Sequence, residues 1–319
     1  MKFVYVLISS KKDYFAEQAL LSMYSVKKHN PDAEIVLVCD ASTLNRLQEE
    51  RNILMDYVDD FITENLPAEL NDVQKNRYLK TSLRQIVKGD FLYLDNDTII
   101  TGNLDDLKNL SVEFGAVLNH HVMLDINKNL HLKKYLEKTK KDFWNYYKYF
   151  NGGSFYAKDT PECHKFFESW HRIWNEDRKK YGISIDQPAF AQANMENNRM
   201  IEEISGIYNC QITQRDAIPY MFDAKIIHYF SNSPTSCLFP LTQPNVLKSV
   251  REKGITEEME KLLERPQIAY LKNSVIIRGE ELRSDYNSPI MIFARKIART
   301  FPFLNNIIRT GYRIFGVKI

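Results

Sequence analysis

The sequence predicts an α/β fold in which a mainly parallel mixed sheet is flanked by helices. Short apolar runs alternate along the first hundred residues with longer stretches in which apolar residues recur at helical spacing. This alternation is typical of βαβ units. In addition, the apolar run Phe91–Leu94 ends abruptly at Asp95, as a buried strand does at the sheet edge where such folds bind ligands.

The expected strands are short runs rich in β-branched and aromatic residues. In chain order they cover residues 3–8, 35–38, 58–62, 91–94, 113–118, 155–156 and 225–230. Polar or turn-forming residues bound most of these runs: Ser9 and Ser10 follow the first, Asp40 follows the second, and Gly153 shortly precedes the sixth. The boundaries therefore agree with strands that end in loops at the sheet edges.

The expected helices lie between these strands. They cover residues 13–29, 42–50, 71–88 and 161–180. In the first, Phe15, Ala19 and Val26 form one apolar stripe. The third has Asp72 as a possible N-cap and Gly89 as its stop.

Composition favours a soluble globular protein. The 319 residues are 44% hydrophobic and 26% charged, and no run approaches the roughly 20 apolar residues needed to cross a bilayer. The first apolar run is also too short for a signal peptide. The formal net charge of +2 says little by itself about partners, and we expect no nucleic-acid partner. One large domain over residues 1–285 with a C-terminal helical extension over residues 286–319 is the simplest organisation.

The four cysteines are far apart in the sequence and form no metal-binding spacing. They are Cys39, Cys163, Cys210 and Cys237. Free, buried thiols in a reducing compartment are the simplest interpretation, which predicts a cytoplasmic protein.

Asp95 and Asp97 form a candidate metal site. Side chains two residues apart on a strand point to the same face, so both carboxylates can converge on one cation. Two neighbouring carboxylates repel each other unless a positive charge lies between them, and a divalent metal prefers oxygen ligands. The alternative is a strand followed by an ordinary polar turn.

Several further features follow one another in a recognisable order. They are Ile8-Ser9-Ser10 at the end of the first strand, Arg77 on a helix, Asp95-Asn96-Asp97, Asn151-Gly152-Gly153, Asp186-Gln187, and His228 in the last strand. This series resembles the nucleotide-sugar-dependent glycosyltransferases of the GT-A (Rossmann-like) fold, most closely glycosyltransferase family 8, over about residues 2–232. That family includes bacterial lipopolysaccharide glucosyl- and galactosyltransferases. The resemblance implies a GT-A catalytic domain over residues 1–285.

The resemblance also implies a metal and a donor substrate. Asp95, Asp97 and His228 would hold manganese (or magnesium), and imidazole with carboxylate suits manganese better. The metal would bridge the diphosphate of a UDP-sugar as a Lewis acid. Asn96 and Arg77 would bind the donor, because a planar guanidinium suits phosphate and sugar. Lys80 and Arg84, further along the same helix face, either share that role or form a solvated basic face.

The nucleoside of the donor would be bound at the end of the first strand. The resemblance places Ile8, Ser9 and Ser10 there, and Tyr14 is suited to stacking on the base. The alternative is an ordinary helix cap at Ser10 or Asp13.

The donor sugar would lie against two later motifs. In the family, the residues corresponding to Asn151, Gly152 and Gly153 contact the donor sugar. Those corresponding to Asp186 and Gln187 recognise its hydroxyls and lie beside the anomeric carbon. The glycines allow a close backbone approach or simply a tight turn. Family 8 enzymes retain anomeric configuration, which implies front-face attack in which the leaving phosphate takes the acceptor proton. Asp186 is also a plausible N-cap for a helix beginning before Pro188.

The chain departs from the family after His228. Members usually carry a glycine and a Lys-Pro-Trp element there, whose lysine contacts the diphosphate. Here Tyr229, Phe230 and Ser231 follow, and no lysine is present up to Ser236. The lid over the diphosphate must therefore be built differently.

Two regions outside these motifs bear on the acceptor and the membrane. Residues 143–150 are dense in aromatics and form either an acceptor platform or a core helix, and the lysines of residues 133–141 face a phosphate-bearing acceptor or water. Residues 287–319 contain no acidic residue, and basic and apolar residues interleave at helical spacing. We expect this tail to lie in an anionic membrane interface, with packing on the domain or across a dimer as the alternative.

The function expected from these features is a metal-dependent retaining glycosyltransferase. It would move a hexose from a UDP-sugar to a lipid-linked or lipopolysaccharide-type glycan, on the inner face of a bacterial plasma membrane. A degenerate, non-catalytic sugar- or membrane-binding GT-A module is the alternative. Asp95-x-Asp97 also resembles the nucleophile motif of haloacid dehalogenase-type phosphatases, but that motif belongs near the N-terminus and Ile99 replaces the expected Thr or Val.

Overall fold

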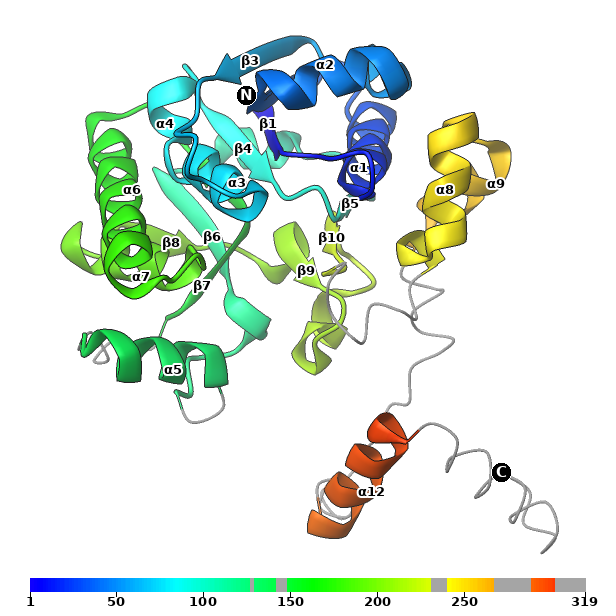
Figure 1. Ribbon diagram of the computed structural model, residues 1–319. Helices are drawn as coiled ribbons and strands as arrows, with labels where there is room; N and C mark the ends of the chain where they lie inside the picture. Colours follow the sequence, from blue (N-terminus) through cyan, green and yellow to red (C-terminus); the bar gives the residue numbers. More distant parts are fainter. Residues whose placement is uncertain (127–128, 142–147, 231–239, 267–287, 302–319) are drawn as a thin grey trace, which may run out of the picture. The chain divides into compact units, whose positions relative to one another are not determined.

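The computed structural model describes residues 1–126, 129–141, 148–230, 240–266 and 288–301 (Figure 1). The chain divides into two compact units, Met1–Lys272 and Asn273–Ile319. The boundary expected at residues 285–286 lies outside the described residues.

The central sheet of the first unit has seven strands. In chain order these are β1 (Lys2–Leu7), β2 (Glu34–Asp40), β3 (Asp60–Glu64), β4 (Phe91–Leu94), β6 (Phe114–Leu118), β7 (Phe150–Ala157) and β8 (Ile201–Glu203). Their spatial order is β3-β2-β1-β4-β7-β6-β8. Only β7 runs antiparallel to its two neighbours, so the mainly parallel mixed sheet expected from the sequence is confirmed.

A second, three-stranded sheet carries part of the site. It consists of β5 (Thr98–Ile100), β9 (Cys210–Gln211) and β10 (Ile226–His228), with β10 in the middle. β10 pairs antiparallel with β5 and parallel with β9. Residues from three distant parts of the sequence therefore meet beside the end of β4.

The helices enclose both faces of the central sheet. They are α1 (Phe15–His29), α2 (Ala41–Glu50), α3 (Asp72–Thr81), α4 (Leu83–Ile86), α5 (Leu130–Thr139), α6 (Pro161–Tyr181), α7 (Gln187–Glu196), α8 (Pro244–Lys253) and α9 (Glu257–Glu264). Figure 1 shows α1 and α6 at opposite sides of the sheet. The second unit contains α12 (Pro289–Thr300).

The apolar core follows the alternation of strand residues. Tyr5 and Leu7 of β1 belong to the cluster that contains α1, whereas Val4 and Val6 belong to the cluster that contains α6. Trp170 and Trp174 of α6 are fully buried in the second cluster. Burying side chains on both faces is what a mainly parallel sheet requires.

The helix expected over residues 71–88 is two helices instead. Asn71, not Asp72, is the N-cap: its Oδ1 accepts a hydrogen bond from the Gln74 N–H, and its own N–H donates to Gln74 Oε1, which forms a capping box. The helix stops at Ser82, whose backbone leaves the helical region and whose Oγ donates to the carbonyl of Tyr78 at 2.7 Å. A short second helix, α4, then carries Arg84 in a different direction.

Several other expectations can be placed on the structure. Cys39, Cys163 and Cys210 are free and buried, as predicted, and Cys237 lies outside the described residues. Of the aromatic run 143–150, residues 143–147 also lie outside them, and Phe150 is a buried residue of β7.

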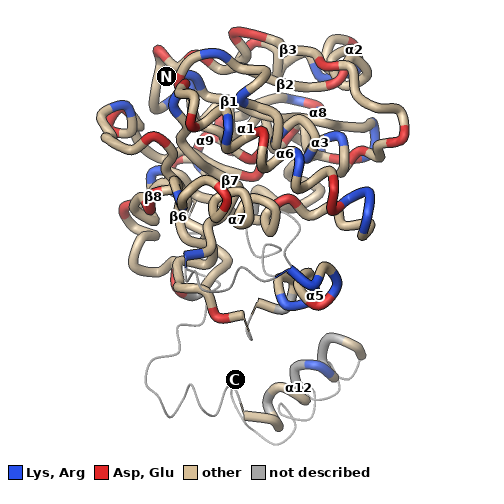
Figure 2. Tube along the Cα trace, turned by 90° about the vertical axis from the view of Figure 1, so that its left-hand side faces the viewer, with Lys and Arg blue, Asp and Glu red and all other residues tan. Residues whose placement is uncertain are grey.

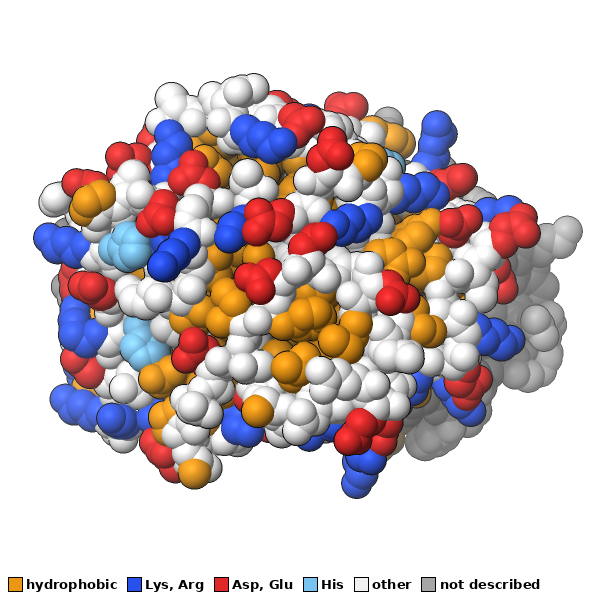
Figure 3. All heavy atoms as spheres, turned by 90° about the horizontal axis from the view of Figure 1, so that it is seen from above, with side chains coloured by type: hydrophobic (Ala, Val, Ile, Leu, Met, Phe, Trp, Pro, Cys, Tyr) orange, Lys and Arg blue, Asp and Glu red, His pale blue; other side chains and the backbone are white. Residues whose placement is uncertain are grey.

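Charges are unevenly spread along the first unit. Figure 2 shows basic residues gathered on α5, where Lys133, Lys134 and Lys138 are exposed. On the face seen in Figure 3, basic and acidic side chains intermingle, with hydrophobic side chains showing between them. The small net charge is therefore not concentrated on that face.

The tail expected to bind membranes is described in part. α12 confirms helix over Pro289–Thr300, and its Ile290, Ile292 and Phe293 are exposed. The basic residues beyond position 301 lie outside the described residues. In the part of the chain that the structure describes, no helix has the length and hydropathy of a membrane span.

Candidate active site

A cavity of about 280 Å³ opens where the carboxyl ends of β1 and β4 meet the start of α3. Its lining combines carboxylates, amides, one arginine and a few apolar side chains: Ile8, Asp13, Phe15, Gln18, Asp72, Val73, Asn76, Arg77, Tyr93, Asp95, Asn96 and Asp97. This is the sheet edge at which α/β folds bind ligands.

The structure brings Asp95, Asp97 and His228 together. One ligand atom from each lies within 4.8 Å of the others, and His228 Nε2 is 3.3 Å from Asp97 Oδ1. Both carboxylates are partly exposed, whereas His228 is buried. Backbone pairing sets this arrangement, because His228 lies opposite Thr98 in the β10–β5 ladder and the Asp95 N–H donates to the Gly153 carbonyl at 2.8 Å.

This group fits a divalent cation. Two carboxylates and an imidazole are ligands that manganese accepts. The amide between them adds a further acceptor: Asn96 Oδ1 is buried and has no hydrogen-bond partner among the described residues, while Asn96 Nδ2 donates to the Val6 carbonyl at 3.1 Å. A buried oxygen left unpaired costs free energy unless a ligand or water satisfies it.

Arg77 and Lys80 bring positive charge to the same place. Arg77 Nε is 3.1 Å from Asp186 Oδ1, and Lys80 Nζ lies 3.0 Å from Asp95 and 3.7 Å from Asp186. Burial raises the pKa of Asp186, but Arg77 and Lys80 outweigh it and hold the pKa below its usual value. Asp186 is therefore an ionised acceptor near neutral pH.

Asp186 and Gln187 stand at the start of α7. Asp186 occupies the N-cap position but makes no side-chain capping bond. Its carboxylate instead pairs with Arg77 and Lys80. The Gln187 side chain hydrogen-bonds to buried Tyr149. Asp186 is thus the N-cap residue by position, as the alternative expected, but its side chain does not cap the helix.

Arg84 does not join Arg77 and Lys80. Its guanidinium is buried, donates to the carbonyls of Val87 and Gly89, and lies 3.6 Å from Asp159. The break after α3 turns it away from the cavity. The expectation that it shares the phosphate role, or forms a solvated face, is therefore not met.

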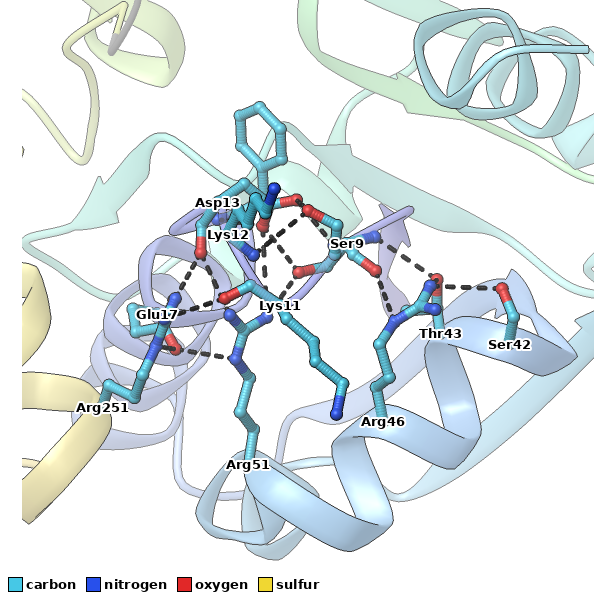
Figure 4. A network of polar contacts seen from close by, with 12 residues as sticks. Ser9, Lys11, Lys12, Asp13, Glu17, Ser42, Thr43, Arg46, Arg51 and Arg251 are labelled. Atoms are coloured by element: carbon cyan, nitrogen blue, oxygen red, sulfur yellow. Dashed lines mark hydrogen bonds and ion pairs between the residues drawn. The ribbon is translucent and has the colours of Figure 1, made fainter.

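The loop Ser9–Asp13 is organised around one carboxylate (Figure 4). Asp13 Oδ1 accepts from Ser9 Oγ at 2.7 Å, and its Oδ2 accepts from the Ser10 N–H and Oγ at 2.6 and 2.8 Å. Ser9 is buried. Both serines therefore use their hydroxyls to shape the loop, whereas Asp13 and the preceding residue Ile8 line the cavity.

Three arginines from outside the loop hold it in place (Figure 4). Arg46 donates to the Ser9 carbonyl at 2.9 Å, Arg51 to the Asp13 carbonyl at 3.0 Å, and Arg251 of α8 to the Asp13 and Lys11 carbonyls. Arg51 and Arg251 also sandwich Glu17, which is 2% exposed, at 3.0 and 2.8 Å. A buried carboxylate thus fixes two guanidiniums that bind the loop.

Tyr14, expected to stack on a base, packs elsewhere. Its ring lies 4.6 Å from the Arg251 guanidinium, while its neighbour Phe15 lines the cavity and is 39% exposed. Tyr14 is the N-cap of α1 and lies outside the helix, which begins at Phe15, so the two rings take different directions.

The Asn-Gly-Gly segment lies in β7 beside His228. Asn151 is buried and hydrogen-bonded to Asn119, Asn209 and the Gly153 N–H. A Cβ on Gly153 would lie 2.2 Å from His228 Cε1, whereas one on Gly152 would meet only Lys80 at 3.8 Å. Gly153 is therefore needed to admit the histidine ring.

Sequence reasoning missed Asn209, Arg51 and Arg251. Each acts on residues 19 or more positions away, and no periodic or motif signal in the sequence links such pairs. Tyr93 was also missed, although it sits two residues before Asp95 and donates to its Oδ1 at 2.5 Å. Its place on the same strand face was the available signal.

Comparison with known proteins rests on structure. No protein-family model and no curated protein matches the chain. The galactosyltransferase LgtC, solved with donor and acceptor sugar analogues, is similar with a TM-score of 0.50 at 16% identity, over 82% of this chain and 99% of LgtC. The bifunctional glycosyltransferase WbbM gives 0.53 at 13% identity, over 83% of this chain and 51% of WbbM.

The chain has the GT-A fold. The fold expected from the order of the motifs is thereby confirmed. At such low identities the GT-A likeness establishes the arrangement of strands and helices, and the chemistry rests on the side chains just described.

Proposed function

We propose that this protein is a metal-dependent retaining glycosyltransferase that moves a hexose from a UDP-sugar to a glycan acceptor. The observation that carries the proposal is the Asp95, Asp97 and His228 group at the mouth of a cavity in a GT-A fold. A binding module needs no such convergence of ligands, whereas transfer from a nucleoside diphosphate needs charge neutralisation at the leaving group.

The metal would be manganese or magnesium, held by Asp95, Asp97 and His228. When bound, it would neutralise charge on the departing diphosphate. Arg77 and Lys80 supply fixed positive charge on the neighbouring side of the cavity. Lys80 is 3% exposed and reaches the cavity through its ion pair with Asp95, which lines it.

Asp186 and Gln187 would orient the donor sugar. Asp186 is ionised and held in place by Arg77 and Lys80, so it would accept hydrogen bonds from sugar hydroxyls without moving. An amide at position 187 is a poor nucleophile, which favours front-face attack, in which the leaving phosphate takes the acceptor proton. Ile8 and Phe15 provide apolar surface for the nucleoside at the other end of the cavity.

The acceptor would be a lipid-linked or lipopolysaccharide-type glycan at an anionic membrane surface. The exposed lysines of α5 and the exposed apolar residues of α12 support this part of the proposal. It predicts that removal of residues 287–319 lowers the fraction of protein bound to anionic vesicles in a sedimentation assay. Equal binding by the full chain and the truncated chain would contradict the membrane role.

The test of the activity is release of UDP from a panel of UDP-sugars, with and without manganese. Release from one donor should depend on manganese and be lost in Asp97→Asn. Asp105→Asn is the matched control, because Asp105 is exposed and pairs only with nearby residues. If wild-type protein does not bind UDP in the presence of manganese, the metal-dependent transferase is ruled out and the non-catalytic GT-A module is favoured.

A further inference from the structure

Asn209 lies directly behind His228. It is fully buried at the end of the short 3-10 helix Gly206–Asn209, and the parallel pairing of β9 with β10 brings it beside the histidine. Its Oδ1 is 3.1 Å from His228 Nδ1, and its Nδ2 is 3.0 Å from Asn151 Oδ1.

A backbone N–H sets the direction of these hydrogen bonds. The Gly153 N–H can only donate, and it points to Asn151 Oδ1 at 2.8 Å. The nitrogen of Asn151 then faces Asn119 Oδ1 at 3.1 Å. The orientation of the Asn151 amide is therefore determined by its partners.

The orientation of Asn209 follows from that of Asn151. Because Asn151 presents an oxygen, Asn209 must turn its Nδ2 toward it and its own Oδ1 toward His228. A carbonyl oxygen only accepts, so His228 Nδ1 must carry a hydrogen. We call Asn119, Asn151 and Asn209 the amide chain.

The hydrogen on Nδ1 determines the state of the other ring nitrogen of His228, Nε2. A neutral imidazole carries one hydrogen, so Nε2 is left with its lone pair, 3.3 Å from Asp97 Oδ1. Two electron-pair donors at that distance favour a cation between them. Gly153 completes the arrangement, because the ring fits only where no Cβ is present.

We infer that Asn209 is a positioning residue that holds His228 in the Nδ1–H form, so that Nε2 is free to bind a divalent metal. The inference rests on the proposed function in that the metal is the one proposed above. Residues that orient a histidine ligand typically change metal affinity by about 10–100-fold when replaced. Asn209→Leu keeps the approximate volume and removes the acceptor, whereas Asn209→Asp keeps an oxygen opposite Nδ1 and loses only the N–H that meets Asn151 Oδ1.

The first measurement is the position of the ring proton. Long-range proton–nitrogen NMR of the full chain, without metal and at mildly alkaline pH, should show the His228 proton on Nδ1 in wild type and in Asn209→Asp. In Asn209→Leu the proton should shift toward Nε2, the form that a free imidazole side chain prefers. A wild-type ring with its proton on Nε2 overturns the inference, whatever the variants do.

The second measurement is manganese affinity, from the electron paramagnetic resonance signal of the free ion, without donor or acceptor. Asn209→Leu should bind about 10–100-fold more weakly than wild type, and Asn209→Asp should recover most of the loss. Equal affinity in wild type and Asn209→Leu overturns the inference even if the metal site is real. Absence of binding by wild type overturns the metal site itself, while the NMR result still decides the orientation of the ring.

Discussion

The two sides of the cavity are held in different ways. On one side, the Ser9–Asp13 loop is held by three arginines whose guanidiniums donate to backbone carbonyls, and buried Glu17 pairs with two of these arginines. On the other side, the neutral amide chain holds His228. A charged clamp derives its strength from charge and tolerates small changes of direction, whereas an amide chain works only if each oxygen and nitrogen points the right way.

Loss of a guanidinium from the charged clamp should produce the largest effect on stability. Arg51→Met removes one of two partners of Glu17 and should lower the free energy of unfolding by about 3 kcal/mol, because a buried carboxylate loses compensation. Urea denaturation measures this. Lys11→Met, at a solvent-exposed pair with Glu50, is the control and should leave the free energy of unfolding nearly unchanged. Similar effects at both sites would show that the clamp is not stabilised by burial.

Crowding of His228 by a side chain at position 153 should lower the free energy of unfolding by less than the loss of Arg51 does. Gly153→Ala places a Cβ 2.2 Å from His228 Cε1 and 2.9 Å from Asn151 Oδ1, so the ring and the amide must move. Overpacking of this kind costs about 1–3 kcal/mol, and manganese binding should weaken with it. Unfolding free energy and calorimetric manganese titration test both effects. Gly102→Ala meets only Lys225 Cγ at 3.5 Å and should leave both unchanged; unaltered manganese binding in Gly153→Ala would contradict the placement of His228.

Mild acid should produce the smallest effect, through His121 beside the amide chain. Its Nε2 accepts from the Gln211 N–H at 3.0 Å, and burial lowers its pKa from 6.5 to about 4. Between these values the unfolded chain binds the proton and the folded chain does not, so this group reduces stability as the pH falls. Relative to wild type, His121→Gln should gain unfolding free energy as the pH is lowered from 6.5 to about 5.5, a range over which only the unfolded chain binds the proton. A pH-independent difference in urea denaturation would refute the shift.

The fold was predictable because it depends on local patterns. The alternation of apolar runs and helical stripes, and the abrupt end of Phe91–Leu94, predicted the sheet and the edge where the cavity lies. The break after α3 was not predictable, because it depends on a serine hydroxyl turned back to the backbone. Because of this break, the expectation that Arg84 lies on the same helix face as Lys80 was wrong.

The site was predictable only where a motif carried it. Asp95, Asp97, Asp186 and His228 were singled out in the sequence. The structure groups His228 with Asp95 and Asp97, which line the cavity, and links Asp186 to Asp95 through Lys80. That they act on a donor and a metal stays a prediction. Asn209 and Arg251 carried no motif, because their partners are defined by strand pairing and helix packing rather than by spacing.

The chain must extend as far as α8 before the Ser9–Asp13 loop beside the cavity has all of its partners. A fragment ending at residue 232 would contain every residue that the sequence assigned to the metal and the donor, yet it would lack Arg251 and leave Glu17 and the Asp13 carbonyl each one partner short. Synthesis proceeds from the N-terminus, so the first loop of the protein leaves the ribosome more than two hundred residues before the arginine that completes its clamp. The earliest part of the site to be made is therefore among the last to be finished.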